Sequence, residues 1–237
     1  MPLNDPDVVR TQYEHERNLR ARQALYEESE GSDPREVAWN AITEADPHRV
    51  LEVGGGPGEV SERMMLELGA DVSFVDISPR MVELARARGI ADARVGDVQE
   101  LPFEDETFDT AVAAWMLYHV PDIDRALAEL ARVLLPGGRL VAVTNAFEHL
   151  HELRELVGWR PSDFESVFNR ANGAELLGRH FDLVEQRDVD GWVTIRDRQK
   201  IVAYRNSLSG VDQLGDLRDF GVPLRIRRAN TVFVATK

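Results

Sequence analysis

The segment Val50-Leu51-Glu52-Val53-Gly54-Gly55-Gly56-Pro57-Gly58 decides the fold of this 237-residue chain, because it joins an apolar run to four closely spaced glycines. A stretch with helical spacing, 59–68, follows it directly. A strand that ends in glycines and continues into a helix lets a ligand approach the backbone closely, with the first amides of the helix directed at it. The sequence therefore predicts a ligand-binding turn between a buried strand and a helix.

The spacing of these glycines separates two classes of cofactor that use such a turn. A dinucleotide site has the pattern G-x-G-x-x-G. Counted from Gly54, the third glycine of that pattern would be residue 59, which is a glutamate. The chain has instead an acidic residue, Glu52, followed by glycines at alternate positions. A nicotinamide-dependent oxidoreductase is therefore the weaker interpretation.

Strand-like and helix-like segments alternate after the turn. Apolar runs predict strands at 50–53, 72–76, 93–95, 108–115 and 139–144. Helices are expected between them at 59–68, after Ser78 as N-cap, and at 123–135. Apolar strands that are separated by helices are typical of a parallel sheet covered on both faces.

The two ends of the chain are less regular. Surface helices are expected before residue 29, and a helix with Asp33 as its N-cap and Pro34 in its first turn is expected to reach about Ala45. After Asn145 the expected helices are 148–157, 163–170, a short one near 174, and 201–208, and the expected strands are 181–189 and 231–236. We interpret this last part as inserted helices that form a cap, together with strands that complete the sheet.

The composition limits the kinds of partner and chemistry. With 28 basic and 42 acidic residues the formal charge is −14, so the surface mostly repels nucleic acid. The chain has no cysteine, which excludes disulfides, cysteine-bound zinc, iron–sulfur clusters and a thiol nucleophile. No apolar run approaches the ~20 residues that span a bilayer, and the N-terminus lacks the order of a secretion signal. We expect a soluble, cytoplasmic protein without a membrane contact or a bound metal.

Five segments of the chain, in order, resemble those of the class I S-adenosylmethionine-dependent methyltransferases, particularly the small-molecule, type 11-like branch. They cover roughly residues 49–145 and are the glycine segment, FVDISPRM (74–81), GDVQELPF (96–103), FDTAV with LYHV (108–112 and 117–120), and LARVLLPGG (130–138). The resemblance implies a three-layer α/β/α sandwich around a seven-stranded, mostly parallel, Rossmann-like sheet whose last strand is antiparallel. It also implies one domain, divided into an N-terminal helical lid (1–33), a cofactor-binding core (34–147), and cap insertions with sheet completion (148–237).

By resemblance, the contacts to the cofactor S-adenosylmethionine lie in the loops after the first four strands. The glycines Gly54, Gly55, Gly56 and Gly58 would lie under its methionine and ribose, and Glu52 would orient their loop. Asp76 would accept hydrogen bonds from both ribose hydroxyls, a task that suits a carboxylate. The remaining cofactor positions are Ile77 and Met81 on the adenine face, Asp97 and Val98 at the adenine amino group, and Ala114 and Trp115 at the end of the fourth strand. Core packing remains an alternative for Met81 and Trp115, and turn chemistry for Asp97.

Tyr118 and His119 occupy the position that the family uses close to the transferred methyl group. His119 is a candidate base for an acceptor hydroxyl or amine. The alternative is a histidine that is hydrogen-bonded within its own loop. His149 and His151 are two residues apart, so a helix would separate their side chains, and we expect both on a solvated helix face.

The choice of substrate is expected to depend on the cap. Four aromatic residues either line an apolar pocket or pack in the core, namely Trp159, Phe164, Phe168 and Trp192. Three N-terminal arginines either reach an anionic group or form an ordinary charged helix face, namely Arg17, Arg20 and Arg22.

The resemblance implies a methyltransferase that moves a methyl group to an oxygen, nitrogen or carbon atom of a small molecule. The Asn/Asp-Pro-Pro-Tyr/Phe element of enzymes that methylate nucleic-acid amino groups is absent, because the fourth strand leads into Ala114-Trp115-Met116-Leu117. The alternative is a noncatalytic S-adenosylmethionine-binding regulatory or partner subunit, since such a protein would have the same cofactor residues.

Overall fold

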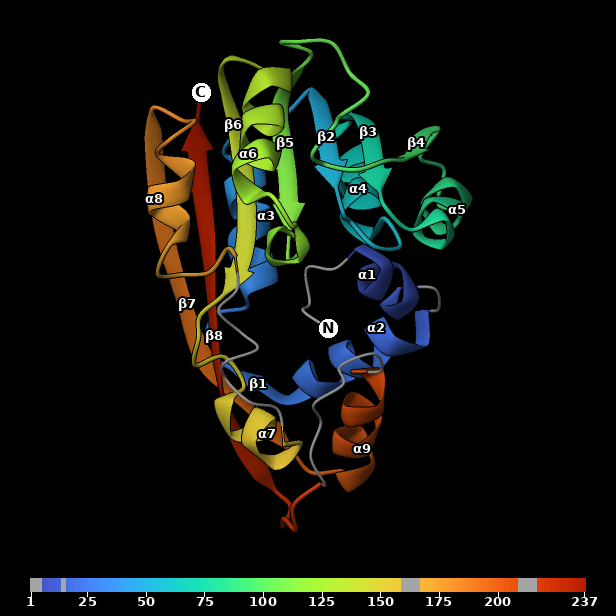
Figure 1. The fold of residues 1–237 in the computed structure, drawn as a ribbon, viewed down its shortest axis with the longest axis vertical. Coiled ribbons are helices and arrows are strands. Elements are labelled where there is room, and N and C mark those ends of the chain that lie inside the picture. Colours follow the sequence, from blue (N-terminus) through green and yellow to red (C-terminus); the bar gives the residue numbers. More distant parts are fainter. Residues whose placement is uncertain (1–5, 14–15, 159–166, 209–216) are drawn as a thin grey trace.

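The computed structural model describes residues 6–13, 16–158, 167–208 and 217–237, which contain an eight-stranded sheet covered by helices (Figure 1). The strand order is β1-β7-β8-β6-β5-β2-β3-β4. The strands are β1 (Ser29–Glu30), β2 (Arg49–Val53), β3 (Asp71–Asp76), β4 (Asp92–Val95), β5 (Phe108–Ala114), β6 (Leu134–Asn145), β7 (Leu183–Ile195) and β8 (Leu224–Thr236). The prediction of a mostly parallel sheet with an antiparallel last strand is confirmed. The additional strand is the two-residue β1, at the edge of the sheet.

The helices follow the expected order. They are α1 (Pro6–Gln12), α2 (Glu16–Gln23), α3 (Pro34–Thr43), α4 (Glu59–Arg63), α5 (Pro79–Ala87), α6 (Ile123–Val133), α7 (His151–Leu156), α8 (Gly173–Leu177) and α9 (Arg198–Ser207). Asp33 and Ser78 are N-caps as predicted, because each side chain accepts a hydrogen bond from a backbone amide of the following helix. Residues 163–166 of the expected helix at 163–170 lie outside the described residues, and residues 167–170 form bends and a turn, so the prediction was wrong for this half. Within the described part of the chain, no helix is long and apolar enough to cross a membrane.

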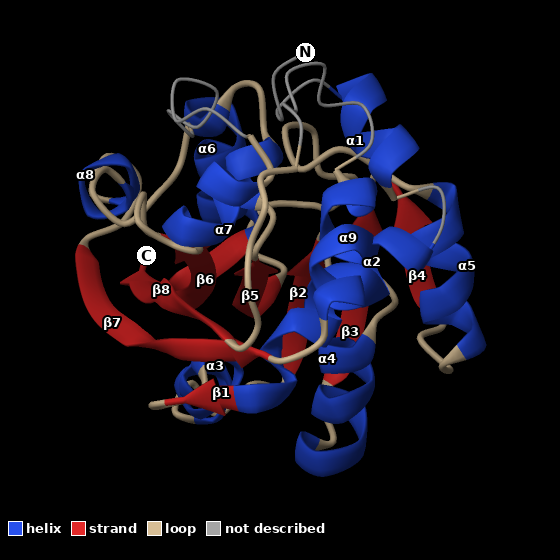
Figure 2. Ribbon diagram, turned by 90° about the horizontal axis from the view of Figure 1, so that it is seen from below, coloured by secondary structure: helices blue, strands red, loops and turns tan. Residues whose placement is uncertain are grey.

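Apolar side chains hold the helices on both faces of the sheet (Figure 2). Ile42 of α3 packs on one face, in the same cluster as Val50 of β2. Leu127 of α6 packs on the other face, in the same cluster as Leu51. The neighbouring residues of β2 therefore point to opposite layers, and both are fully buried. This burial on two faces explains why the parallel strands are continuous apolar runs in the sequence.

The pairing of β2 with β3 brings two predicted site segments together. Val53 lies opposite Val75, and the amide of Gly54 donates a hydrogen bond to the Val75 carbonyl at 2.8 Å. The glycine turn and Asp76 therefore lie side by side at the carboxyl end of the sheet.

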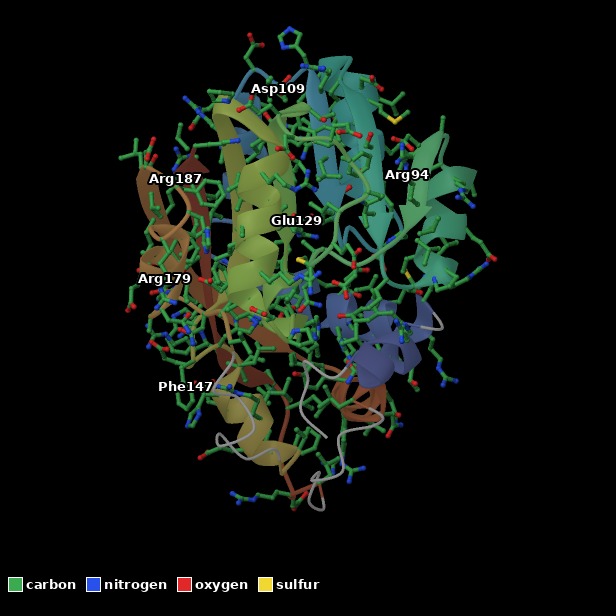
Figure 3. All side chains as sticks on the ribbon, turned by 45° about the horizontal axis from the view of Figure 1, so that its top comes forward. Arg94, Asp109, Glu129, Phe147, Arg179 and Arg187 are labelled. Atoms are coloured by element: carbon green, nitrogen blue, oxygen red, sulfur yellow. The ribbon has the colours of Figure 1, made fainter. Side chains whose placement is uncertain are left out.

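A different carboxylate fixes the opposite end of the sheet. Asp109, near the start of β5, accepts hydrogen bonds from the backbone amides of His48 and Arg49, the latter at 2.7 Å. Figure 3 shows Asp109 at the end of the molecule remote from the cap. This acidic residue joins β5 to the start of β2 and has a structural role.

β7 and β8 extend beyond the rest of the sheet. They pair along their length as far as Ile195 opposite Leu224, whereas β6 pairs with β8 only as far as Asn145 opposite Asn230. Residues 190–195 of β7 and 224–229 of β8 therefore extend past β6 as an arm, visible at the bottom of Figure 1, and β1 pairs with β7 there at Trp192 and Val193.

The predicted strands at 181–189 and 231–236 were too short, because they omitted this arm. The arm has one exposed face, so Ile226 is buried while its neighbour Arg225 is exposed. Such alternation lacks the continuous apolar run that identified the parallel strands.

A separate apolar cluster attaches the cap to the arm. It joins Leu153 of α7, Ile201 of α9 and Leu25 of the 3-10 turn after α2 to Ile226 of the arm. As a result α2, α7 and α9 lie beyond the end of the sheet at which β2 and β3 stop (Figure 1).

Candidate functional site

A cavity of about 770 Å³ lies between the carboxyl ends of the strands and the cap. The glycine turn and the ends of β3 and β5 form one part of its wall, and residues of α2, α7 and α9 form the other. Small-molecule sites typically have volumes of ~300–1,000 Å³. Doubly wound sheets bind ligands at this edge, so the position and the size of the cavity both suit a small-molecule site.

The cavity brings together twelve of the fourteen residues that the resemblance assigns to the cofactor and to catalysis. They are Glu52, Gly54, Gly55, Gly56, Asp76, Ile77, Asp97, Val98, Ala114, Trp115, Tyr118 and His119. Gly58 and Met81 do not line it. Met81 is 1% exposed, so it occupies a packing position. Gly58 precedes α4 with φ 81°, and a Cβ there would lie 2.7 Å from Cδ1 of Ile90.

The Glu52 carboxylate lies in direct contact with the glycine turn. It accepts a hydrogen bond from the hydroxyl of Ser61 on α4, and a Cβ on Gly55 would overlap it. Burial raises the pKa of Glu52 to about 7, and the nearby charge of Asp76 acts in the same direction. Direct contact with the turn therefore gives Glu52 the means to orient the loop.

Asp76 and Asp97 present two fixed carboxylates to the cavity. Asp76 accepts hydrogen bonds from the amides of Ser78, at 2.8 Å, and Gly56. It is 7% exposed, and burial raises its pKa to about 6. Asp97 accepts hydrogen bonds from both the backbone and the side-chain amide of Gln99 at 2.9 Å. These hydrogen bonds from Gln99 are typical of a turn, and they hold the Asp97 carboxylate in place at the cavity wall.

The three glycines at the cavity have different reasons to lack a side chain. A Cβ on Gly54, where φ is 62°, would lie 2.7 Å from the Cβ of Met116, so the turn packs directly against the segment after β5. Among the described residues, a Cβ on Gly56 would have only Leu19 of α2 near it, at 3.5 Å. The backbone of Gly56 therefore faces open space, where a ligand can approach it.

We expect Gly54→Ala to lower the free energy of unfolding by about 2 kcal/mol, from about 1 kcal/mol of left-handed strain plus a similar cost for the contact with Met116. Gly69→Ala is the matched control, because Gly69 has φ 67° but, in the part of the chain that the structure describes, no atom lies within 4 Å of the place that the added methyl group would take. The Gly69→Ala variant should lose only the stability that the left-handed strain costs, about 1 kcal/mol. Urea unfolding of both variants measures the difference, and equal losses would contradict close packing between the turn and β5.

The end of β5 turns sharply toward the cavity. Trp115 has φ 55°, an unfavourable value for a bulky residue, and its amide donates a hydrogen bond to the Val143 carbonyl at 2.9 Å. A 3-10 turn, Leu117–His119, follows at once. Trp115 therefore lies at the cavity wall, and Tyr118 and His119 join it there.

His119 is hydrogen-bonded to a residue from the N-terminal segment. Its Nε2 lies 3.2 Å from the hydroxyl of Tyr13, to which Arg22 donates a hydrogen bond at 3.4 Å. A tyrosine hydroxyl can accept a hydrogen bond from Arg22 and donate its own proton, so it is able to donate to Nε2 of a neutral His119 ring. The ring of Tyr118 lies 4.5 Å from that of His119, and burial raises the pKa of Tyr118 well above its usual range.

The expectation that His149 lies on a solvated helix face was wrong. His149 precedes α7 and is 8% exposed, because the arm and the cap close around it. Its Nδ1 accepts a hydrogen bond from the amide of Ala229 at 3.1 Å, and its Nε2 lies 2.9 Å from the Tyr26 hydroxyl. Burial lowers its pKa to about 3, so it is neutral. His151 is partly exposed beside Glu155, and the described residues contain no group of three or more His, Asp or Glu side chains that could hold a metal.

The structure also resolves most of the alternatives left open for the cap. Arg17 and Arg20 are exposed as an ordinary helix face would be, whereas Arg22 lines the cavity. Phe168 is fully buried core, and Trp192 is 38% exposed outside the cavity. Trp159 and Phe164 lie outside the described residues.

Several cavity residues had no recognisable signal in the sequence. They are Tyr13, Tyr26, Trp39, Arg154, Tyr204, Arg228 and Asn230. Tyr13 and Tyr26 show only helical periodicity in the sequence, which does not separate a cavity residue from a packed one. The arm places Arg228 and Asn230 at the cavity, so their role depended on a strand extension that was not predicted.

Comparisons with known proteins identify the family of the chain. A family model described as a methyltransferase domain matches residues 51–142. An uncharacterized methyltransferase of Mycobacterium tuberculosis is 37% identical over 183 residues, which cover 75% of this chain and 70% of that protein. A ubiquinone/menaquinone biosynthesis C-methyltransferase, UbiE of Brucella abortus, is 36% identical over 116 residues. That match covers 45% of this chain and 43% of the relative, so the chain spans less than half of UbiE.

A solved structure from Thermotoga maritima, described as a SAM-dependent methyltransferase and possible histamine N-methyltransferase, aligns with a TM-score of 0.55 and 23% identity. The alignment covers 84% of this chain and 87% of that one, and at this identity it shows a common fold alone. The identity to the mycobacterial protein extends through most of both chains, well beyond the glycine turn. This chain therefore belongs to the class I S-adenosylmethionine-dependent methyltransferase family.

Proposed function

We propose that the chain transfers a methyl group from S-adenosylmethionine to an oxygen, nitrogen or carbon atom of a small-molecule acceptor. The observation that carries this proposal is the single cavity that joins the glycine turn and Asp76 to His119 and extends under the cap. One end of the cavity suits the cofactor, and the other leaves room for a second molecule.

The residues at the first end fit the cofactor. The open backbone at Gly56 and the carboxylate of Asp76 lie next to each other, joined by a hydrogen bond. The carboxylate keeps lone pairs for two ribose hydroxyls, because backbone amides occupy only part of its capacity. Asp97 and the amide of Val98 would receive the adenine. Bound here, S-adenosylmethionine supplies a methyl group already activated by a sulfonium.

The protein then contributes mainly alignment and exclusion of water. Holding two reactants in line is worth up to ~7–11 kcal/mol of the barrier. Trp115 and Tyr118 wall the cavity close to the end of β5. For an acceptor that must lose a proton, His119 would take it at Nε2 through the hydroxyl of Tyr13, which already lies 3.2 Å away.

We expect the acceptor to be a small molecule and not a nucleic acid, because the formal charge of −14 opposes binding to a phosphate backbone. We also propose that residues 1–33 act as a lid on the core, since Tyr13, Leu19, Arg22 and Tyr26 all line the cavity.

The test is transfer of a labelled methyl group from S-adenosylmethionine to the components of a metabolite extract. We expect the label to appear in a small-molecule fraction and to depend on the protein. Tight binding of S-adenosylhomocysteine in calorimetry without any transfer would overturn the proposal in favour of a noncatalytic cofactor-binding subunit. Absence of both would reject the cofactor itself.

A further inference from the structure

The half of the cavity under the cap contains three arginines from three distant segments. Arg22 comes from α2, Arg154 from α7 and Arg228 from the arm of β8. Arg154 and Arg228 are only 5% and 2% exposed, and burial lowers the pKa of both. A buried cation is costly to desolvate, so a group of them calls for a compensating anion.

The described residues supply Arg22 and Arg228 with neutral hydrogen-bond acceptors only. Arg228 donates to the carbonyl of Ser32 at 2.5 Å and more weakly to that of Glu30, and its Nε has no partner there. Arg22 donates to the side chain of Gln12 at 2.9 Å and to the carbonyl of Ser207 at 2.8 Å. No carboxylate of the described residues lies within ion-pair distance of either guanidinium.

The carboxylates on the neighbouring wall are already paired with other arginines. Each therefore has a cation of its own, although the charges of Asp33 and Asp190 still act on Arg228, and those of Glu148 and Glu152 act on Arg154. The pairs are Asp33 with Arg35 at 2.6 Å, Glu36 with Arg63 at 3.2 Å, and Glu59 with Arg88 at 3.3 Å.

A neutral donor accompanies the arginines. The Ala229 amide donates to Nδ1 of His149, so the ring proton is on Nε2 and is donated to the oxygen of Tyr26. The hydroxyl proton of Tyr26 is then available to a molecule in the cavity. Tyr26 lies within the electrostatic range of both Arg22 and Arg228, so these donors serve one region.

We propose that the acceptor carries a carboxylate or phosphate group, which binds to Arg228 and Arg154 and accepts a hydrogen bond from the hydroxyl of Tyr26. A guanidinium binds such oxyanions through two parallel hydrogen bonds. Apolar surface from Leu150, Tyr204 and Leu208 surrounds the subsite and would cover the rest of the molecule. This inference rests on the proposed function, because it names the class of its acceptor.

The two ends of the cavity then match two ligands of opposite charge. Glu52, Asp76 and Asp97 lie at the end assigned to the cofactor, whose sulfonium and ammonium exceed its carboxylate by one positive charge. The arginines lie at the cap end. This polarity favours one orientation for each ligand and disfavours the exchange of their places.

The first test uses the unmodified protein saturated with S-adenosylhomocysteine. Calorimetry measures the affinities of benzoate, phenyl phosphate and neutral benzamide, which share a ring and differ in charge. We expect at least one anion to bind about tenfold or more tightly than benzamide, and the better anion identifies a carboxylate or a phosphate as the ligand group. Equal affinity of all three would overturn the inference.

The second test uses Arg228→Gln, with Arg225→Gln as the matched control. Arg225 lies on the same strand but is exposed and paired with Glu30 at 2.9 Å. We expect Arg228→Gln to lower the affinity for the better-binding anion about tenfold. Arg225→Gln should leave that affinity unchanged. Tyr26→Phe, which keeps the ring, tests the same subsite with a smaller loss if the arginine variant does not fold.

The affinity for S-adenosylhomocysteine separates the outcomes. We expect it to stay within about twofold in all variants, because the subsite is not assigned to the cofactor. A tenfold loss of affinity for S-adenosylhomocysteine in Arg228→Gln would mean that Arg228 binds the cofactor's own carboxylate. That result would overturn the inference. If the unmodified protein binds no S-adenosylhomocysteine, the proposed function itself fails.

Discussion

Asp76→Asn is expected to stabilise the cofactor-free protein by about 2 kcal/mol at neutral pH and, at the same time, to weaken the binding of S-adenosylhomocysteine at least tenfold. The stabilising effect arises because burial raises the pKa of Asp76 from 3.8 to about 6. A shift of about two units corresponds to about 3 kcal/mol of differential interaction between the two protonation states, which sets an upper limit. Asparagine removes the buried charge and keeps an oxygen for the amide of Ser78.

The sign of this effect depends on pH. Between about pH 4 and pH 6 the unfolded chain has released the Asp76 proton while the folded chain still holds it, so the folded state binds more protons. The free energy of unfolding of the unmodified protein therefore falls as the pH rises through this window, and the Asp76 contribution to the fall ends above it. Glu52, with a pKa near 7, adds a fall of the same sign in both proteins. The advantage of Asp76→Asn should be small at pH 4 and complete at pH 7.5.

The loss of affinity has a separate cause. Ribose hydroxyls donate hydrogen bonds, and a carboxylate can accept two of them, whereas the amide of asparagine turns one donor toward the ribose. Urea unfolding at pH 4 and 7.5 measures the first effect, and calorimetry with S-adenosylhomocysteine measures the second. Asp71→Asn is the control, because Asp71 begins the same strand and is exposed. Unchanged cofactor affinity in Asp76→Asn would move the ribose site elsewhere, and a loss of stability at pH 7.5 would contradict the cost of the buried charge.

His119→Gln is expected to lower the rate of methyl transfer about 100-fold, in the range typical of a positioned general base. The affinity for S-adenosylhomocysteine should stay within about twofold, because the cofactor contacts that we propose lie at the ends of β2, β3, β4 and β5 and do not include His119. Steady-state kinetics with the acceptor found by label transfer measures the rate. Its pH profile should lose the ionisation of the base in the variant.

Two further variants sharpen this experiment. Tyr13→Phe removes the hydroxyl that lies 3.2 Å from Nε2 and should reproduce part of the loss. His180→Gln is the control, because His180 pairs with Asp124 at 3.0 Å outside the cavity. An unchanged rate in His119→Gln would make this histidine a structural residue of its loop, as the alternative interpretation holds.

The local sequence was a good guide to the centre of the fold because its signals are contiguous. The run from Val50 to Gly58 contains most of a strand, a turn and the N-cap of the next helix within nine residues. The parallel strands are buried on both faces, so each is recognisable by itself. Asp33 and Ser78 were identified as caps for the same reason, since a cap acts on amides only two or three residues away.

The same reasoning was less successful for the cap. The arm of β7 and β8 is buried on one face only. Its charged residues interrupt the apolar run by which a strand is recognised in the sequence. His149 appeared to belong to a solvated helix because its burial comes from Ala229 and Tyr26, which are 80 and 123 residues distant. Met81 matched a family position but packs away from the cavity, which its residue type did not indicate.

By itself, then, the sequence determined the α/β sheet, the glycine turn and the acidic residues at or just after the carboxyl ends of β2, β3 and β4, because short-range patterns and strand ends encode them. Only the tertiary structure decided which other residues share the cavity. Arg22, Arg154 and Arg228 meet there because the arm carries one strand past the sheet and the cap folds back onto it. Their proximity depends on packing between distant segments, and no local pattern of residues records it.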